Sequence, residues 1–122
     1  MAVLNFKDLI VWQKSMNLVT EVYALTNILP KEELYALSTQ MRRAAVSIPS
    51  NIAEGQKRKS PKEFCNFLSI ARGSLGELET QLLICVQLNY LSEQQIDDSI
   101  NLCEEIYKML NALIEKLIAK DA

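Results

Sequence analysis

The spacing of apolar residues in the second half of the chain constrains the fold most. Apolar side chains recur at alternating steps of four and three, over residues 64–85 and again over 96–117. This spacing places them on one face of an α-helix, and its average of about 3.5 residues predicts shallow, left-handed packing between helices. The two stripes are Phe64, Leu68, Ala71, Leu75, Leu78, Leu82 and Cys85, and Ile96, Ile100, Cys103, Tyr107, Leu110, Ile114 and Leu117.

The first half of the chain contains two further helical patterns. We expect one helix over about residues 7–29 and another from "PKEEL" (30–34) to about Gly55, or as far as Lys57. The first carries two neighbouring stripes: Leu9, Trp12, Met16, Val19 and Tyr23, and Val11, Leu18, Val22, Leu25 and Leu29. The second carries Leu34, Leu37, Met41, Ala44, Ile48 and Ile52.

Capping signals and short links define the fold class. Ser60, Pro61 and Glu63 are typical of a helix start with a capping box, and Ser92 with Gln95 forms a second one. Glycine and proline are scarce, at three each, which disfavours a sheet protein with many turns. The sequence therefore predicts an all-α, up-and-down antiparallel four-helix bundle that forms a single domain over residues 1–122.

Pro49 lies inside the second predicted helix. Proline removes one backbone hydrogen bond and clashes with the carbonyl four residues earlier, that of Ala45. Apolar periodicity resumes after it, so we expect a kink rather than a stop. Ser47, Ser50 and Asn51 could bond the freed backbone groups.

The composition argues against several classes of function. The chain has no histidine, the commonest general base and the commonest nitrogen ligand for metals, so we expect no catalytic residue, metal site or cofactor. Its three widely spaced cysteines indicate a reduced, cytoplasmic, structural role. We see no signal peptide, and no apolar run approaches the ~20 residues of a membrane span.

Positive charge is concentrated in residues 40–75. This segment has seven basic and two acidic residues, a net +5, whereas the rest has six basic and thirteen acidic residues, a net −7. An antiparallel hairpin turning near Lys59 would bring Arg43 and Arg72 to nearly the same level. The predicted nucleic-acid-binding residues are Arg42, Arg43, Lys57, Arg58, Lys59, Lys62 and Arg72. No aromatic residue interleaves the basic run, so we expect backbone or shape recognition rather than base stacking.

A protein-interaction scaffold is the alternative. Here the arginines pair internally with Glu77 and Glu79. Apolar residues in excess of the stripes on the first and fourth helices would then contact a partner or another copy of the chain. On the fourth helix these are Leu102, Ile106, Met109, Leu113 and Ile118.

The glycines are a further structural signal. Gly73 and Gly76 lie within the third predicted helix, where each costs up to about 1 kcal/mol, so we expect a close backbone neighbour. No strand precedes them and no Gly-Lys-Ser/Thr follows, which excludes a phosphate-binding loop. With Gly55, Pro49 and Asn51, they form the set of structural residues that the sequence predicts.

Three long strings resemble a known family: "FKDLIVWQKS", "LYALSTQMRRAAVSIPSNIAEG" and "FLSIARGSLGELETQLLI". They look like the small bacterial four-helix bundle (S23-like) proteins encoded by intervening sequences in 23S ribosomal RNA genes. That family is similar in fold to the accessory variability protein of diversity-generating retroelements, a pentamer that works with a reverse transcriptase and nucleic acid.

The resemblance implies a non-enzymatic homopentamer whose biochemical role is poorly defined. The family's motif includes Arg42, Arg43 and Arg72, so the resemblance implies that these residues form a candidate basic surface. The inclusion of Lys57 to Lys62 in that surface is based on charge clustering alone. The leading hypothesis is a cytoplasmic homo-oligomer that binds nucleic acid, RNA or DNA and preferably structured RNA, through its second and third helices. The alternative is a scaffold that binds a protein partner and no nucleic acid.

Overall fold

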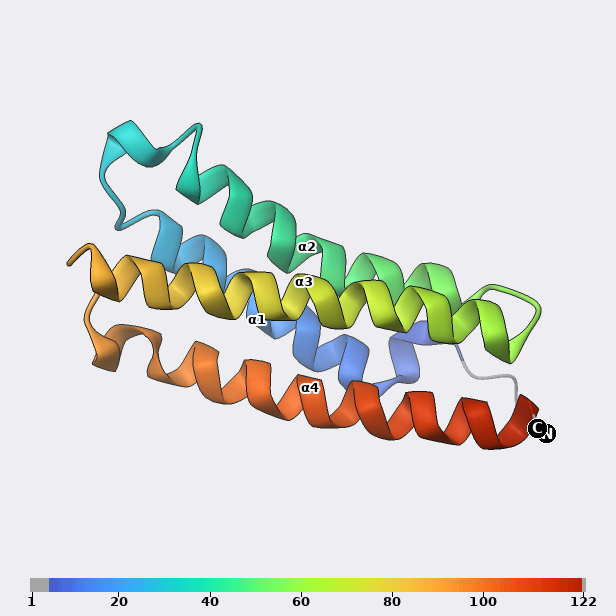
Figure 1. Ribbon diagram of the computed structural model, residues 1–122. Coiled ribbons are helices and arrows are strands. Elements are labelled where there is room, and N and C mark those ends of the chain that lie inside the picture. Colours follow the sequence, from blue (N-terminus) through green and yellow to red (C-terminus); the bar gives the residue numbers. More distant parts are fainter. Residues whose placement is uncertain (1–4, 122) are drawn as a thin grey trace.

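Each of the four amphipathic segments forms an α-helix in the computed structural model, which describes residues 5–121. Helices are its only regular elements within that range. They are α1 (Ile10–Thr26), α2 (Leu37–Gln56), α3 (Pro61–Gln87) and α4 (Glu93–Asp121), with short 3₁₀ turns η1 (Phe6–Asp8) and η2 (Lys31–Glu33). Neighbours along the chain pack side by side, and α1 also packs against α4 (Figure 1). The predicted four-helix bundle is confirmed; residues 1–4 and 122 lie outside the described range.

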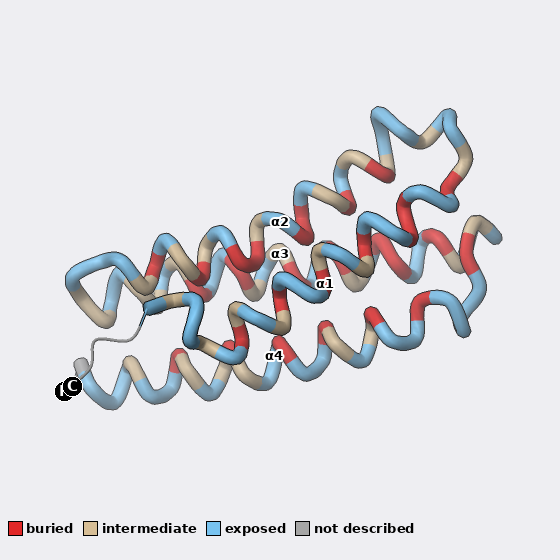
Figure 2. Tube along the Cα trace, turned by 180° about the vertical axis from the view of Figure 1, so that it is seen from behind, coloured by how far each residue is buried: buried red, intermediate tan, exposed pale blue. Residues whose placement is uncertain are grey.

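The core runs along the inside of all four helices (Figure 2). On α3 the predicted stripe is buried from Leu68 to Cys85, and Phe64 packs against it from a half-buried position. Met41, Ile48 and Ile52 of α2 are also fully buried. The 4-3 spacing therefore identified the inner faces of α2 and α3.

The inner face of α4 differs from the predicted stripe. Tyr107 is 48% exposed, and its neighbour Ile106 is fully buried in its place. The buried positions run from Ile96 to Ile114 in five steps, through Ser99, Cys103, Ile106 and Leu110. Those 18 residues average 3.6 per step, which is the pitch of a straight α-helix rather than of a heptad.

The inner face of α1 is the second of its two stripes. Val11, Leu18 and Val22 are buried, whereas Met16 and Tyr23 of the first stripe are 43% and 41% exposed. A helix at the edge of one four-helix core buries only about a third of its surface. The side chains of the first stripe are therefore partly exposed on the surface of the bundle.

Helix boundaries in the first half were predicted too broadly. The chain enters through η1, which Asn5 caps by accepting a hydrogen bond from the Lys7 amide, and extended backbone at Leu9 precedes α1. After α1 the "KEE" segment forms the 3₁₀ turn η2, so α2 begins at Leu37 and Leu34 is 43% exposed. The acidic start at "PKEEL" therefore marks a separate turn rather than the first turn of α2.

Pro49 is buried inside α2, and Figure 1 shows the helix bending midway along its length. The side chains near the bend join α2 to α3 through a hydrogen bond of 2.8 Å between Ser47 Oγ and Ser74 Oγ. Asn51 Nδ2 donates to Ser47 O at 2.8 Å and to Ser47 Oγ at 2.9 Å. We expected Ser47, Ser50 or Asn51 to bond the backbone groups that Pro49 frees; the Asn51 side chain bonds the Ser47 carbonyl, four residues before it, rather than that of Ala45.

Serine side chains cap α3 and α4, as predicted. The capping box predicted at α3 is incomplete, because Glu63 Oε2 accepts a hydrogen bond from Ser60 Oγ at 3.2 Å rather than from the Ser60 amide. Ser60 Oγ accepts a hydrogen bond from the Glu63 amide at 3.1 Å, with Pro61 in the first turn. At α4, Ser92 N donates to Gln95 Oε1 at 2.8 Å and Gln95 N donates to Ser92 Oγ at 3.1 Å, a complete capping box. These caps fix the first turns of α3 and α4.

The three glycines occupy different environments. A Cβ atom at Gly55 would lie 2.6 Å from Phe67 Cβ, so α2 and α3 approach closely there. At Gly73 and Gly76 nothing lies within 4 Å of the corresponding position. The prediction of a close neighbour for these two residues is therefore wrong within the protomer, because they lie on the outer face of α3.

The cysteines are all free: Cys85 and Cys103 are buried, and Cys65 is half-buried. Within the described residues, no helix combines the length and the apolar character needed to cross a membrane.

Candidate nucleic-acid interface

The link between α2 and α3 forms a basic tip, which we define as Lys57, Arg58, Lys59 and Lys62. All four side chains are exposed, and no acidic residue interrupts the sequence from Gly55 to Lys62. The tip lies at the same end of the bundle as η1 and the last turns of α4 (Figure 1). It therefore presents several cations at one end of an elongated molecule.

Two phenylalanine rings lie beside the basic tip. The Arg58 guanidinium lies 4.8 Å from the centre of the Phe67 ring, and Lys57 Nζ lies 5.7 Å from that of Phe6. Arg58 also forms an ion pair with Glu54 at 3.0 Å. The sequence showed no aromatic residue within the basic run, yet folding brings these two rings to it from other segments.

Lys59 and Lys62 have no ion-pair partner among the described residues, where the ion pairs are Lys14–Glu105 and Arg58–Glu54. Their charges are therefore balanced by solvent and counterions, which a phosphate group can displace.

Arg42 faces α1. Its Nε donates to Thr26 Oγ1 at 2.8 Å, and its Nη2 donates to Asn27 Oδ1 at 2.9 Å. Its guanidinium lies 4.7 Å from the centre of the Tyr23 ring. These contacts fix the side chain across the groove between α1 and α2.

Arg43 and Arg72 point in other directions. Arg43 is exposed and borders two hollows, one against α1 and one against Ser74 and Glu77 of α3. Arg72 Nη1 donates to Asn111 Oδ1 of α4 at 2.7 Å. The predicted basic surface thus separates into the tip and three arginines that face different neighbours, and within the described chain none of the three forms an ion pair with Glu77 or Glu79.

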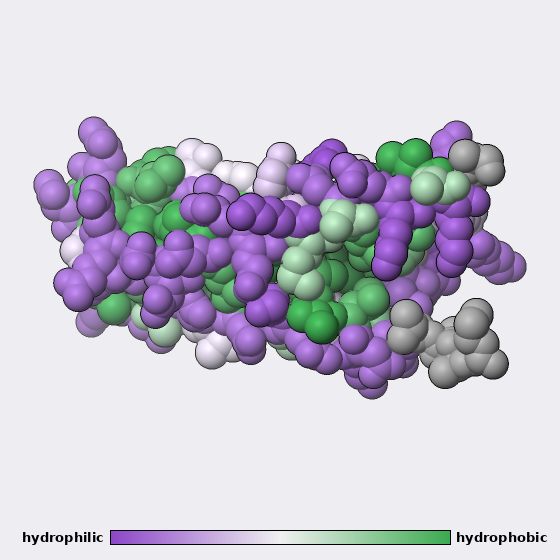
Figure 3. Space-filling view, turned by 90° about the horizontal axis from the view of Figure 1, so that it is seen from below, coloured by the Kyte–Doolittle hydropathy of each residue, from purple (hydrophilic) through white to green (hydrophobic). Residues whose placement is uncertain are grey.

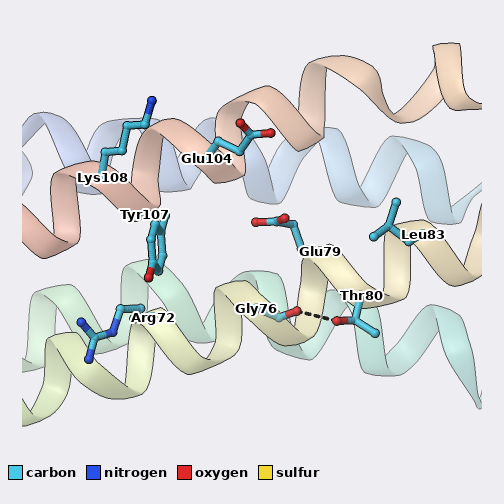
Figure 4. A pocket seen from close by; sticks show the side chains of 8 residues that line it. All are labelled: Arg72, Gly76, Glu79, Thr80, Leu83, Glu104, Tyr107 and Lys108. Atoms are coloured by element: carbon cyan, nitrogen blue, oxygen red, sulfur yellow. Dashed lines mark hydrogen bonds between the residues drawn. The ribbon is translucent and has the colours of Figure 1, made fainter.

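A groove of about 460 Å³ between α3 and α4 brings Glu79 and Glu104 together. Figure 4 shows the Glu79 carboxylate and the Tyr107 ring in the space between the helices, with the Lys108 ammonium pointing away from α3. Burial, and then the Glu104 charge, raise the pKa of Glu79. The sequence analysis missed this pair because the two residues are 25 positions apart and no local pattern joins them.

The chemistry of the buried thiols is suppressed. Burial, and then the charges of Glu79, Glu21 and Glu104, raise the pKa of Cys103 to about 12. The pKa of Cys85 is also raised, by burial and then by Glu33. In the described part of the chain, no cluster of three or more cysteine or carboxylate side chains is placed to hold a metal ion.

The surface seen from the α4 side is mostly hydrophilic, with apolar patches toward both ends of the bundle (Figure 3). A hollow of about 340 Å³ lies between α1 and α4, with Leu9, Ile10, Met109 and Leu113 among its lining residues. The predicted apolar excess on α4 is thus distributed: Ile106 is in the core, Leu102, Met109 and Leu113 are half-buried, and Ile118 is 59% exposed.

Comparison with known families agrees with this architecture. The family model described as 23S rRNA-intervening sequence protein matches residues 7–112. The chain belongs to this family. Most of α4, and all of α1 to α3 with the basic tip, fall within the matched range, so the motif resemblance is confirmed.

One solved structure is also similar to this chain. It is a protein of unknown function from the S23 ribosomal protein family of Bacteroides thetaiotaomicron VPI-5482, with a TM-score of 0.80 and 28% identity. The match covers 86% of this chain and 98% of that one. No curated protein matches this chain.

Proposed function

We propose that this family member is a non-catalytic, self-associating bundle that binds structured RNA through its basic tip. The observation that carries the proposal is the exposed cluster Lys57, Arg58, Lys59 and Lys62, in which only Arg58 has an acidic partner among the described residues. A phosphate backbone gains affinity from such a cluster by releasing counterions.

The neighbouring rings support contact with unpaired bases. Phe67 and Phe6 lie next to Arg58 and Lys57, and bases splayed from RNA loops stack on aromatic rings and guanidinium planes. The family name refers to intervening sequences of 23S rRNA, which makes a folded RNA hairpin from such a sequence the first ligand to test.

Salt dependence of binding is the direct test. We would measure the dissociation constant for a fluorescent RNA hairpin by anisotropy across a series of salt concentrations. Each phosphate contact contributes a slope of about −0.7 to −0.9 in log K against log salt. The variant Lys59→Ala/Lys62→Ala should therefore reduce the slope by about 1.4 to 1.8.

Lys31→Ala/Lys108→Ala is the matched control, because it removes the same charge from exposed positions away from the tip. It should change the slope by less than half as much. Equal effects of the two double variants, or a wild-type affinity that does not change with salt, would contradict binding at the tip.

The scaffold remains the second candidate because of the exposed apolar side chains on α1, on α3 and in the turn that follows α1. Ile10, Ile28, Ile70 and Leu83 are each more than half exposed. A scaffold would show no RNA affinity in the same titration.

A further inference from the structure

The hollow between α1 and α4 lies close to the basic tip. The 3₁₀ turn η1 connects the two, because the Phe6 ring lies 5.7 Å from Lys57 Nζ of the tip, and Asp8 lines the hollow two residues later. The tip, η1 and the last turns of α4 share one end of the bundle (Figure 1). An RNA strand that leaves the tip along η1 therefore passes over the hollow.

The hollow is apolar inside and charged at its rim. Six of its eight lining residues are apolar, among them Ile10 of α1 and Met109 and Leu113 of α4. The other two, Asp8 and Lys116, are charged and exposed. Its volume of about 340 Å³ is at the lower end of the range of about 300–1,000 Å³ for small-ligand sites. The hollow therefore suits a small, flat group that carries both polar edges and a negative charge.

The two rim charges offer different interactions. In the described chain Lys116 forms no ion pair, so its ammonium can replace the counterions of a phosphate. Asp8 Oδ2 accepts a hydrogen bond from the Asn5 amide at 3.3 Å, which holds the carboxylate at the end of η1. Carboxylates in proteins accept hydrogen bonds from the amino group of cytosine. A cytosine nucleotide thus matches the ammonium, the apolar floor and the carboxylate together.

Other occupants use less of this lining. An apolar side chain of a protein partner would fill the middle of the hollow and bind neither Asp8 nor Lys116. A fatty carboxylate would pair with Lys116 but would bring a like charge toward Asp8. A nucleotide is the occupant that engages both charges, and bases splayed from RNA loops are available for such contacts.

We propose that the hollow is a subsite for one unpaired base of the RNA bound at the tip, with a preference for cytosine over uracil. The base lies over Met109 and Leu113, its amino group donates to Asp8, and its phosphate pairs with Lys116. Uracil presents the acceptor O4 where cytosine presents the amino group, so it is repelled by Asp8. The inference rests on the proposed function and specifies its ligand as RNA with unpaired cytosines next to the segment held by the tip.

Nucleotide titration tests the subsite without RNA. The probes are cytidine monophosphate and uridine monophosphate, and the readout is the NMR signal of the methionine methyl groups. Cytidine monophosphate should shift the Met109 methyl signal, because the base ring lies against it, and should leave that of Met41, which is fully buried in the core. Uridine monophosphate should bind at least about fivefold more weakly.

Three variants separate the contributions of the lining. Ala112→Phe fills the hollow and should abolish the Met109 shift. Asp8→Asn should remove the preference for cytosine, because an amide can also donate to uracil O4 and can still accept from the Asn5 amide. Lys116→Ala should weaken both nucleotides equally. Lys108→Ala is the matched control, because it removes the same charge from α4 in the α3–α4 groove and should change neither affinity.

Circular dichroism would confirm that each variant is folded. An unshifted Met109 signal, equal affinities for the two nucleotides, or a cytosine preference that survives Asp8→Asn would overturn the assignment.

The RNA hairpin distinguishes this subsite from the basic tip. Replacing its unpaired cytosines by abasic nucleotides should weaken binding at least about fivefold and keep the salt slope, because the phosphates remain. A normal salt slope with no effect of the abasic positions would overturn the subsite and leave RNA binding at the tip intact. A Met109 response to cytidine monophosphate without salt-dependent RNA binding would instead overturn the proposed function.

Discussion

Alanine substitutions at Gly55 and Gly73 should change stability in opposite directions. Both glycines lie within helices, where alanine is favoured by up to about 1 kcal/mol. At Gly73 nothing lies within 4 Å of the new Cβ atom. Gly73→Ala should therefore raise the free energy of unfolding by about 0.5–1 kcal/mol.

At Gly55 the same atom would meet Phe67 Cβ at 2.6 Å and Phe64 Cδ1 at 3.0 Å. The first of these atoms is attached directly to the α3 backbone, so the helices must separate rather than a side chain turn away. Overpacking of this kind costs about 1–3 kcal/mol. After the propensity gain, Gly55→Ala should lower the free energy of unfolding by about 0–2 kcal/mol.

Urea denaturation followed by circular dichroism measures both changes. A difference of about 2 kcal/mol between the variants corresponds to about 1 M in the midpoint when the slope is near 2 kcal/mol/M. Self-association would make the midpoint depend on protein concentration, so each variant is measured at two concentrations. If Gly55→Ala raised the midpoint as much as Gly73→Ala, close packing of α2 on α3 would be refuted.

Three further predictions concern single side chains. Ser74→Ala removes the hydrogen bond to Ser47 Oγ and should lower the free energy of unfolding by about 1 kcal/mol, measured by urea denaturation. An unchanged midpoint would show that this bond makes no net contribution to stability. The pKa of Glu79 is raised from its usual 4.5 by burial and then by Glu104. The folded state therefore holds this proton to higher pH than the unfolded state, and stability falls as pH rises through that window. Melting temperatures measured across a pH series would show this fall, and Glu79→Gln should make it smaller. An unaltered pH profile in the variant would contradict the raised pKa of Glu79. The half-buried Cys65 should react with a thiol reagent before Cys103, whose pKa is raised to about 12. Peptide mass spectrometry would identify which cysteine is labelled first, and earlier labelling of Cys103 would contradict the prediction.

Local sequence patterns predicted the helices well where one face is buried along its whole length. The stripe from Leu68 to Cys85 was correct because α3 packs against both α2 and α4. On α4 the heptad reading placed Tyr107 inside, because a 3.5-residue repeat and a 3.6-residue helix diverge over six turns. The boundary at Leu37 was missed because acidic residues favour the start of a 3₁₀ turn as well as of an α-helix.

The candidate site was less predictable because it depends on contacts between distant segments. Charge clustering identified the basic tip, but nothing local places Phe6 beside Lys57. Height along a hairpin placed the arginines of α2 and α3 at similar levels, yet it does not determine the direction in which each side chain points. The Ser47–Ser74 hydrogen bond places Arg43 level with residue 78, about 9 Å along the bundle from Arg72 at ~1.5 Å per residue. Arg42 reaches α1 and Arg72 reaches α4, so the arginines share neither a level nor a surface.

The position of the basic tip at one end of the bundle affects valency. If copies of the proposed oligomer associate side by side in the same orientation, their long axes are roughly aligned and all their tips lie on one rim. A folded RNA long enough to touch two tips would then bind the second at a high effective concentration, and its avidity could exceed the affinity of one tip by about 10²–10⁴. Short RNA fragments would lack this gain, so the length of the RNA would govern the strength of binding more than its sequence.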